Sequence, residues 1–155
     1  MYNTTQMMLS RTGITLTALQ TSLLSTVYQW YNGSNTTNGE LAFLTSISAL
    51  AEGYSNETDL RALQSLSLLN VGSQAQYKFM MEPSQMIQAR EILKTALQSE
   101  PNHPGILHYL IHAYDVPVAN VAQQGAGYAT SYGMVVKTAS HAQHMPSHIW
   151  VQLGE

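Results

Sequence analysis

The sequence predicts an all-α protein built from antiparallel helical hairpins. Apolar residues recur at spacings of three and four through most of the 155-residue chain, which is the pattern of helices that bury one face. Gly and Pro gather at a few positions, where they mark turns between helices. Strands have little support. We therefore expect seven helices, near residues 5–31, 39–54, 57–71, 84–100, 104–115, 118–132 and 141–153.

The first three of these helices are separated by clear turn signals. The stretch "YNGSNTTNG" at 31–39 contains Asn-Gly and clustered Ser and Thr, which favour a loop. Asn56 is followed by "ETD", so we expect it to cap the third helix, with acids in the first turn. The segment 70–83 is expected to be an irregular insertion that Pro83 closes.

The last four helices follow in two pairs. Ser84 is placed to cap the helix at 84–100, and the "HPG" at 103–105 precedes the next one. The sixth helix, 118–132, is rich in Gly and Gln. In the seventh, Pro146 either breaks or begins a helix, which makes a loop of 141–145 a second reading.

Small residues repeat at spacings that are typical of the tetratricopeptide repeat. Ala89, Leu93, Ala96 and Pro101 stand at offsets of 0, 4, 7 and 12, where small residues let the neighbouring helix approach and a proline ends the unit. The next hairpin repeats the offsets 0, 4 and 7 with Ala122, Ala126 and Ala129. Tyr114 stands where the first helix of such a repeat places an aromatic residue. The sequence thus predicts a short α-solenoid of tetratricopeptide type.

The low charge of the chain limits its partners. Charged residues make up 10% of the sequence and the net charge is −3, with six Lys and Arg that are scattered. Without a basic cluster, nucleic acid is not an expected partner. A weakly charged surface repels neighbours weakly, which favours self-association or a covering of carbohydrate.

Four Asn-x-Ser/Thr triplets predict N-linked glycans and an extracellular or periplasmic location. They lie at Asn3, Asn32, Asn35 and Asn56. A chain rich in Asn, Ser and Thr also forms such triplets by chance. The absence of cysteine excludes disulfides and thiolate metal sites but leaves the compartment open. No apolar run approaches the roughly 18 residues that a membrane helix needs.

All six histidines lie in two short segments, "HPGILHYLIHAYD" at 103–115 and "HAQHMPSHIW" at 141–150. His108 and His112 are four residues apart, as are His144 and His148, so each pair projects from one helix face. If the two helices are neighbours, four imidazoles converge on one ion of zinc, copper or nickel. Residues His103, His141 and Asp115 would join the first or second ligand shell. Met145, beside His144, keeps copper among the candidates.

A purely structural role for the histidines is the alternative. A histidine at a packing position often bonds to the backbone and fixes a turn, as "HPG" suggests for His103. Asp115 is the sole acidic residue between His103 and His148, so a general base for hydrolysis has little support. The sequence leaves catalysis undecided and favours a non-catalytic protein.

The two histidine segments also carry a family resemblance. "SEPNHPGILHYLIHAYD" and "HAQHMPSHIWVQLGE" resemble a family of tetratricopeptide-like proteins with an HPGxxHYxIHA and an HxxHMPxHI segment. The resemblance covers roughly residues 39–155 and implies the fold, but the family has no established activity. The helix at 118–132 departs from the family pattern because it lacks the expected charged positions. Relatives continue into further repeats beyond "WVQLGE", so we expect either a piece of a longer protein or packing on another copy.

Two regions and one function follow from these observations. We expect an N-terminal helix and Gly/Asn-rich loop over 1–38 and a repeat domain over 39–155. The predicted function is a non-catalytic scaffold that associates with itself, in a filament where the contact does not close, or with another protein. The alternative is a histidine-rich metal-binding protein or a metal-dependent enzyme, with zinc or copper as its only cofactor.

Overall fold

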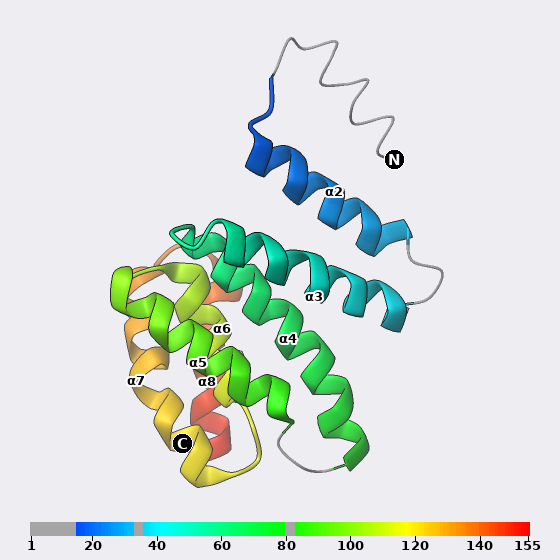
Figure 1. Ribbon diagram of the computed structural model, residues 1–155. Helices are drawn as coiled ribbons and strands as arrows, with labels where there is room; N and C mark the ends of the chain where they lie inside the picture. Colours follow the sequence, from blue (N-terminus) through cyan, green and yellow to red (C-terminus); the bar gives the residue numbers. More distant parts are fainter. Residues whose placement is uncertain (1–14, 33–35, 80–82) are drawn as a thin grey trace. The chain divides into compact units, whose positions relative to one another are not determined.

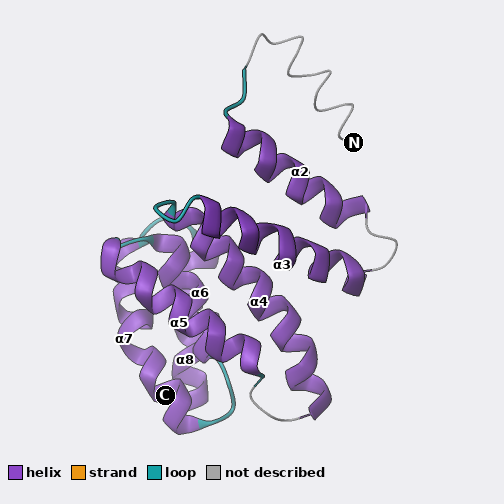
Figure 2. Ribbon diagram, viewed as in Figure 1, coloured by secondary structure: helices purple, strands orange, loops and turns teal. Residues whose placement is uncertain are grey.

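The computed structural model describes residues 15–32, 36–79 and 83–155, and over these ranges all of the regular secondary structure is helical (Figure 2). This confirms the predicted all-α fold. Seven helices are described, and their bounds are α2 Ala18–Asn32, α3 Thr36–Gly53, α4 Thr58–Phe79, α5 Ser84–Ser99, α6 Pro104–Tyr114, α7 Ala119–Val135 and α8 Ser140–Leu153. None of the helices in the described ranges is long and apolar enough to cross a membrane.

The chain forms two compact units, residues 1–55 and 56–155. The first contains the hairpin of α2 and α3, which pack against each other. Trp30 stacks on Phe43 with ring centroids 4.9 Å apart, and Gly39 passes so close to the Trp30 carbonyl that an added Cβ would lie 2.8 Å from it. The predicted domain boundary, between a region over 1–38 and a repeat domain over 39–155, stays a prediction.

The second unit stacks α4 to α8 as successive antiparallel hairpins. In Figure 1, α4 and α5 run in opposite directions side by side, and each later helix packs on the one before it. In addition, α4 packs on α6 and α6 packs on α8. These contacts join each hairpin to the next one along the chain. In a solenoid, successive hairpins stack in this way, and each buries its apolar face against its neighbour.

Small residues provide the close approaches between these helices. Ala89 and Leu93 of α5 are completely buried, as the predicted repeat requires. In α7, Ala122 and Ala129 are completely buried, whereas Ala126 is half-buried and its neighbour Gly125 takes the inner position. The repeat spacing therefore identified the buried face of α7 but shifted its middle residue by one.

Helix α4 corrects the prediction of an irregular insertion at 70–83, because it continues without a break to Phe79. Gly72 is buried, and an added Cβ would lie 3.0 Å from Met86 Cγ on α5. A glycine in a helix costs about 1 kcal/mol relative to alanine. Here the close packing of α5 on α4 offsets that cost, and sequence propensity alone does not reveal it.

Helix α8 confirms the helix predicted at 141–153 over the second reading of a loop at 141–145, because Pro146 lies inside a helix that begins at Ser140. Met145 and Ile149, on either side of the proline, are completely buried. Burial of two such side chains contributes roughly 3 to 6 kcal/mol, comparable to or larger than the ~3 kcal/mol cost of an interior proline. Tertiary packing therefore holds this segment helical.

Two residues that were predicted to cap helices, Ser84 and Asn56, do not occupy the N-cap position. Helix α5 is preceded by Pro83 in the cap position, with no side-chain cap, and Ser84 is its first helical residue. Because α4 begins at Thr58, Asn56 lies two residues before the helix, exposed in the turn after α3.

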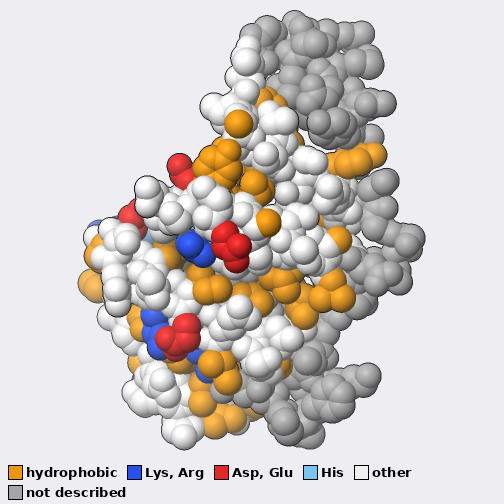
Figure 3. Space-filling model, in the orientation of Figure 1, with side chains coloured by type: hydrophobic (Ala, Val, Ile, Leu, Met, Phe, Trp, Pro, Cys, Tyr) orange, Lys and Arg blue, Asp and Glu red, His pale blue; other side chains and the backbone are white. Residues whose placement is uncertain are grey.

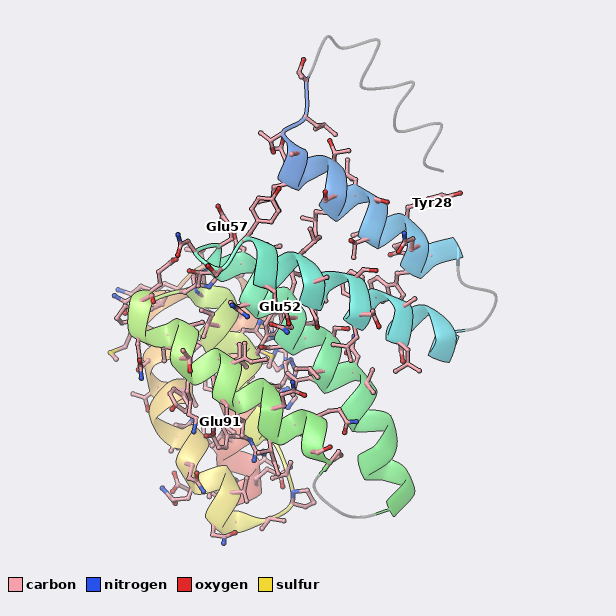
Figure 4. All side chains as sticks on the ribbon, in the orientation of Figure 1. Tyr28, Glu52, Glu57 and Glu91 are labelled. Atoms are coloured by element: carbon pink, nitrogen blue, oxygen red, sulfur yellow. The ribbon has the colours of Figure 1, made fainter. Side chains whose placement is uncertain are left out.

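The charged side chains of the described surface are few and dispersed. Figure 3 shows a few small groups of acidic and basic side chains on the face in view, and in two of these groups the acidic and basic atoms adjoin. Glu91, labelled on α5 in Figure 4, forms an ion pair of 2.5 Å with Lys94 one turn later. An exposed pair of this kind contributes little to stability.

Candidate metal centre

Five of the six histidines form one cluster of imidazole rings between α6 and α8. His108 and His112 come from α6, and His141, His144 and His148 come from α8. We call these five residues the histidine cluster. Going around it, adjacent ring centroids are 4.9, 5.8, 5.3, 4.7 and 5.6 Å apart in the order 108, 112, 148, 144, 141 and back to 108. The rings therefore close a complete circuit.

The fold brings these two helices together through a glycine on α7. An added Cβ on Gly125 would lie 2.7 Å from Tyr114 Cβ on α6 and 2.9 Å from Ile149 Cδ1 on α8. Only a residue without a side chain permits this approach. Tyr114 and Ile149 lie within two residues of His112 and His148, so this close approach is next to the cluster on both helices.

Two pairs of ring nitrogens already face each other. His108 Nε2 lies 3.1 Å from His112 Nε2, and His144 Nε2 lies 3.3 Å from His148 Nε2. Two nitrogens bound to one tetrahedral zinc, each about 2.0 to 2.1 Å from it, lie about 3.3 Å from each other. Each helix thus presents two imidazoles at the separation of two ligands on one ion.

The rings are not yet arranged as a closed metal site. Over the described residues, no three His, Asp or Glu side chains converge as a ready set of ligands. The other three ring contacts connect the two pairs. His141 lies 5.6 Å from His108 and 4.7 Å from His144, and His112 lies 5.8 Å from His148, between ring centroids. A third ligand therefore requires rotation of a side chain.

Asp115 orients one of these imidazoles. Its Oδ2 lies 2.8 Å from His148 Nδ1, and its Oδ1 accepts a hydrogen bond of 2.8 Å from Gln152 Nε2. A carboxylate beside Nδ1 places the ring proton there, which leaves the Nε2 lone pair of His148 directed toward His144. Carboxylate–histidine pairs of this kind fix the tautomer and raise the basicity of metal ligands.

Arg90 holds the end of α6 from which Asp115 projects. Its Nε donates a hydrogen bond of 2.7 Å to the Ala113 carbonyl, a second donation comes from its Nη2, and its guanidinium lies 4.5 Å from the centre of the Tyr114 ring. Asp115 is the residue that ends this helix. The buried arginine therefore fixes the backbone just before the carboxylate.

Burial keeps the α6 histidines neutral. Desolvation, followed by the nearby His112 and the α8 histidines, lowers the pKa of His108 to about 4, and its Nδ1 lies 3.3 Å from the Tyr132 hydroxyl. Desolvation and His148 also lower the pKa of His112, against a smaller opposing effect of Asp115. Metal ions bind the neutral imidazole, so a proton competes weakly for these two rings at neutral pH.

Comparison with known proteins identifies no relative. No family model, no curated protein and no solved structure matches this chain. The chemistry of the centre therefore follows from its own geometry.

The sixth predicted histidine serves a different purpose. His103 Nδ1 accepts a hydrogen bond of 3.2 Å from the Ile106 amide and so caps α6, while its Nε2 lies 3.1 Å from Asp59 Oδ1. This is the backbone-bonding role that the "HPG" segment suggested. Asp115, the other residue expected in either shell, orients His148 as described above.

Two polar residues at the centre were absent from the sequence prediction. Tyr132 on α7 contacts His108, and Gln152 on α8 contacts Asp115. Gln152 follows His148 by four residues and so shares its helix face, a spacing that signals it in retrospect. Tyr132 had no such signal, because its helix carries no histidine.

Two of the four predicted glycosylation residues lie within the described part of the chain. Asn56 is exposed in a turn, and Asn32 is the last residue of α2. Asn3 and Asn35 lie outside the described residues.

Proposed function

We propose that this protein binds a transition-metal ion at the histidine cluster. The observation that carries the proposal is the pair of Nε2–Nε2 separations, 3.1 Å on α6 and 3.3 Å on α8, which match two ligands on one ion. The hydrogen bond between His148 and Asp115 supports it, because outer-shell carboxylates of this kind accompany metal-binding histidines.

The donor set favours zinc or copper. Imidazole nitrogen suits zinc, copper and nickel, whereas calcium and magnesium require oxygen ligands. The chain contains no cysteine, so a thiolate site for a softer ion is excluded. Met145 follows His144 but is completely buried between helices, where it fills the core. Nitrogen ligation without sulfur therefore describes the site best.

A bound metal ion accounts for the grouping of these imidazoles, which packing of the helices alone does not require. His108, His112 and His148 are partly buried and His141 and His144 are exposed. These imidazoles repel one another whenever more than one is protonated, and after desolvation this repulsion is the next cause of the lowered pKa of His108. A bound cation replaces that repulsion with five candidate ligands and links α6 to α8. We therefore propose that the ion stabilises the last two hairpins of the second unit.

The proposal is tested by metal content and by titration. Protein purified without chelator is expected to contain one equivalent of zinc or copper by inductively coupled plasma mass spectrometry. Chelator-treated protein is expected to recover that ion with a sharp end point in isothermal titration calorimetry. The double variant His108→Ala, His148→Ala removes one ligand from each pair and should weaken binding at least a hundredfold.

His103→Ala is the matched control, because it removes the imidazole that caps α6 and that lies outside the cluster. It should retain the ion and lose only the stability of one helix cap. Circular dichroism of both variants shows whether the helices persist. Equal metal binding by the double variant and wild type would contradict the proposal.

A scaffold role is the second candidate, and exposed apolar side chains favour it. Met134 at the end of α7 is 64% exposed and Val151 on α8 is 70% exposed. With charged residues at only 10%, little repulsion opposes contact between copies. Light scattering after gel filtration should then give a mass above 17.1 kDa that falls in a Met134→Glu, Val151→Glu variant; an unchanged mass in that variant would refute it.

A further inference from the structure

A pocket of about 280 Å³ opens beside the histidine cluster, between α4, α5 and α6. Its walls are lined by Leu66, Leu69, Asn70, Ser73, Met86, His112 and Asp115. All seven belong to the second unit of the chain. Two of them, His112 and Asp115, also belong to the metal centre.

The lining divides into an apolar part and a polar part. Leu66, Leu69 and Met86 offer hydrocarbon and thioether surface. Asn70, Ser73 and Asp115 offer amide, hydroxyl and carboxylate groups. Pockets for small organic ligands combine a mostly apolar wall with a few polar groups that fix orientation. A volume of 280 Å³ is just below the usual range for drug-sized ligands, so the occupant is small.

The carboxylate decides the charge of the occupant. Asp115 is the only lining residue with a formal charge, since no Lys or Arg borders the pocket among the described residues. Its oxygens each accept one hydrogen bond, from His148 and from Gln152, and each has a second lone pair available. The polar end of the pocket therefore attracts a donor or a cation and repels an anion.

We propose that this pocket binds a small molecule with an apolar body and a hydrogen-bond-donating head, preferably a primary amine. The apolar body lies against Leu66, Leu69 and Met86, and the head donates to Asp115. The pocket exists without any metal ion, so this proposal is independent of the proposed function. Its position beside His112 places the head of such a ligand next to the centre.

Three probes of one size and shape separate the charge classes. Benzylamine is cationic at pH 7.5, benzyl alcohol is a neutral donor and benzoate is an anion. Each is titrated into ¹⁵N-labelled, chelator-treated protein and followed by amide chemical shifts. We expect the amide shifts to change around residues 66–73 and 112–115. Benzylamine should bind at least tenfold more tightly than benzoate, and benzyl alcohol should have an intermediate affinity.

Two variants locate the site and test the role of charge. Ser73→Leu fills the pocket and should weaken benzylamine binding at least tenfold, whereas Ser99→Leu, the same change at an exposed position on α5, should leave it unchanged. Asp115→Asn should abolish the preference for the amine over the alcohol while both still bind. The amide spectrum of each variant reports whether it is folded.

The outcomes distinguish this proposal from metal binding. Absence of binding by all three probes would overturn it, as would tighter binding of benzoate than benzylamine. Wild-type affinity in a folded Ser73→Leu variant would place the ligand elsewhere and also overturn it. Because the protein is free of metal throughout, a failure to bind zinc or copper does not change any of these results.

Discussion

Replacing Asp115 by Asn should weaken metal binding by a factor between 10 and 100. Both carboxylate oxygens are engaged, one with His148 Nδ1 at 2.8 Å and the other with Gln152 Nε2 at 2.8 Å. An asparagine offers one acceptor and one donor group in their place. One of the two donors must therefore face the new amide N–H, and the ring of His148 loses its fixed tautomer.

The size of the effect follows from the kind of bond that is lost. A hydrogen bond to a charged group contributes about 1.5 to 3 kcal/mol, and Asp115 is only 23% exposed, so solvent screens it partially. A loss of 1.4 kcal/mol corresponds to a factor of ten in affinity, so the expected range is about 1.4 to 2.7 kcal/mol. Outer-shell substitutions at metal-bound histidines have effects of this size.

The assay is competition for zinc against a chromophoric chelator at pH 7.5, with wild type and variant measured side by side. Asp59→Asn is the matched control. Asp59 contacts His103 in a similar His–Asp pair at 3.1 Å, but it is 86% exposed and outside the cluster. An Asp115→Asn affinity within threefold of wild type, or an equal loss in Asp59→Asn, would refute the assignment of Asp115 as the residue that orients His148.

Three further predictions concern packing, pH and modification. Gly125→Ala should lower the free energy of unfolding, measured by urea titration, by about 1 to 3 kcal/mol, because the added Cβ overpacks against Tyr114. Gly127→Ala is the control: an added Cβ there meets no atom within 4 Å, so the change should be neutral or stabilising. The lowered pKa of His108, about 4 against 6.5 when unfolded, contributes stability that is fully present above pH 6.5 and lost as the pH falls toward 4. After allowance for partial solvation this amounts to about 1.5 kcal/mol in metal-free protein, and His108→Asn should reduce the pH dependence of urea unfolding between pH 7.5 and 4. If the protein is made in a secretory pathway, deglycosylation should reduce its intact mass, and Asn56→Gln should remove part of that change; an unshifted mass would remove the argument for an extracellular location.

The helical fold was predictable because its signals are local. Spacings of three and four residues mark every described helix of the second unit, and the small residues Ala89, Ala122 and Ala129 mark faces that are buried in the structure. The predicted end of the helix at residue 71 was wrong, because α5 packs closely against Gly72 and α4 continues past it. The helix predicted at 141–153 is confirmed, and Pro146 does not break it because Met145 and Ile149 beside it are buried.

The sequence also separated the histidines into two segments and identified both i, i+4 pairs, since helix geometry alone puts residues four apart on one face. It could not establish that the two faces meet, because that depends on how α6, α7 and α8 pack. Gly125 is inconspicuous in a helix with three glycines, yet its lack of a Cβ lets α6 and α8 approach.

Sequence by itself determined the class of fold, the hairpin order and the residues able to ligate a metal, because all of these depend on neighbours along the chain. Tertiary structure alone decided which histidines assemble, that the Asp115 carboxylate contacts His148, and that Tyr132 contacts His108. The physical reason is range. Helical periodicity extends over a few residues, whereas the contact between His148 and Asp115 spans 33 positions and forms only after three helices have packed.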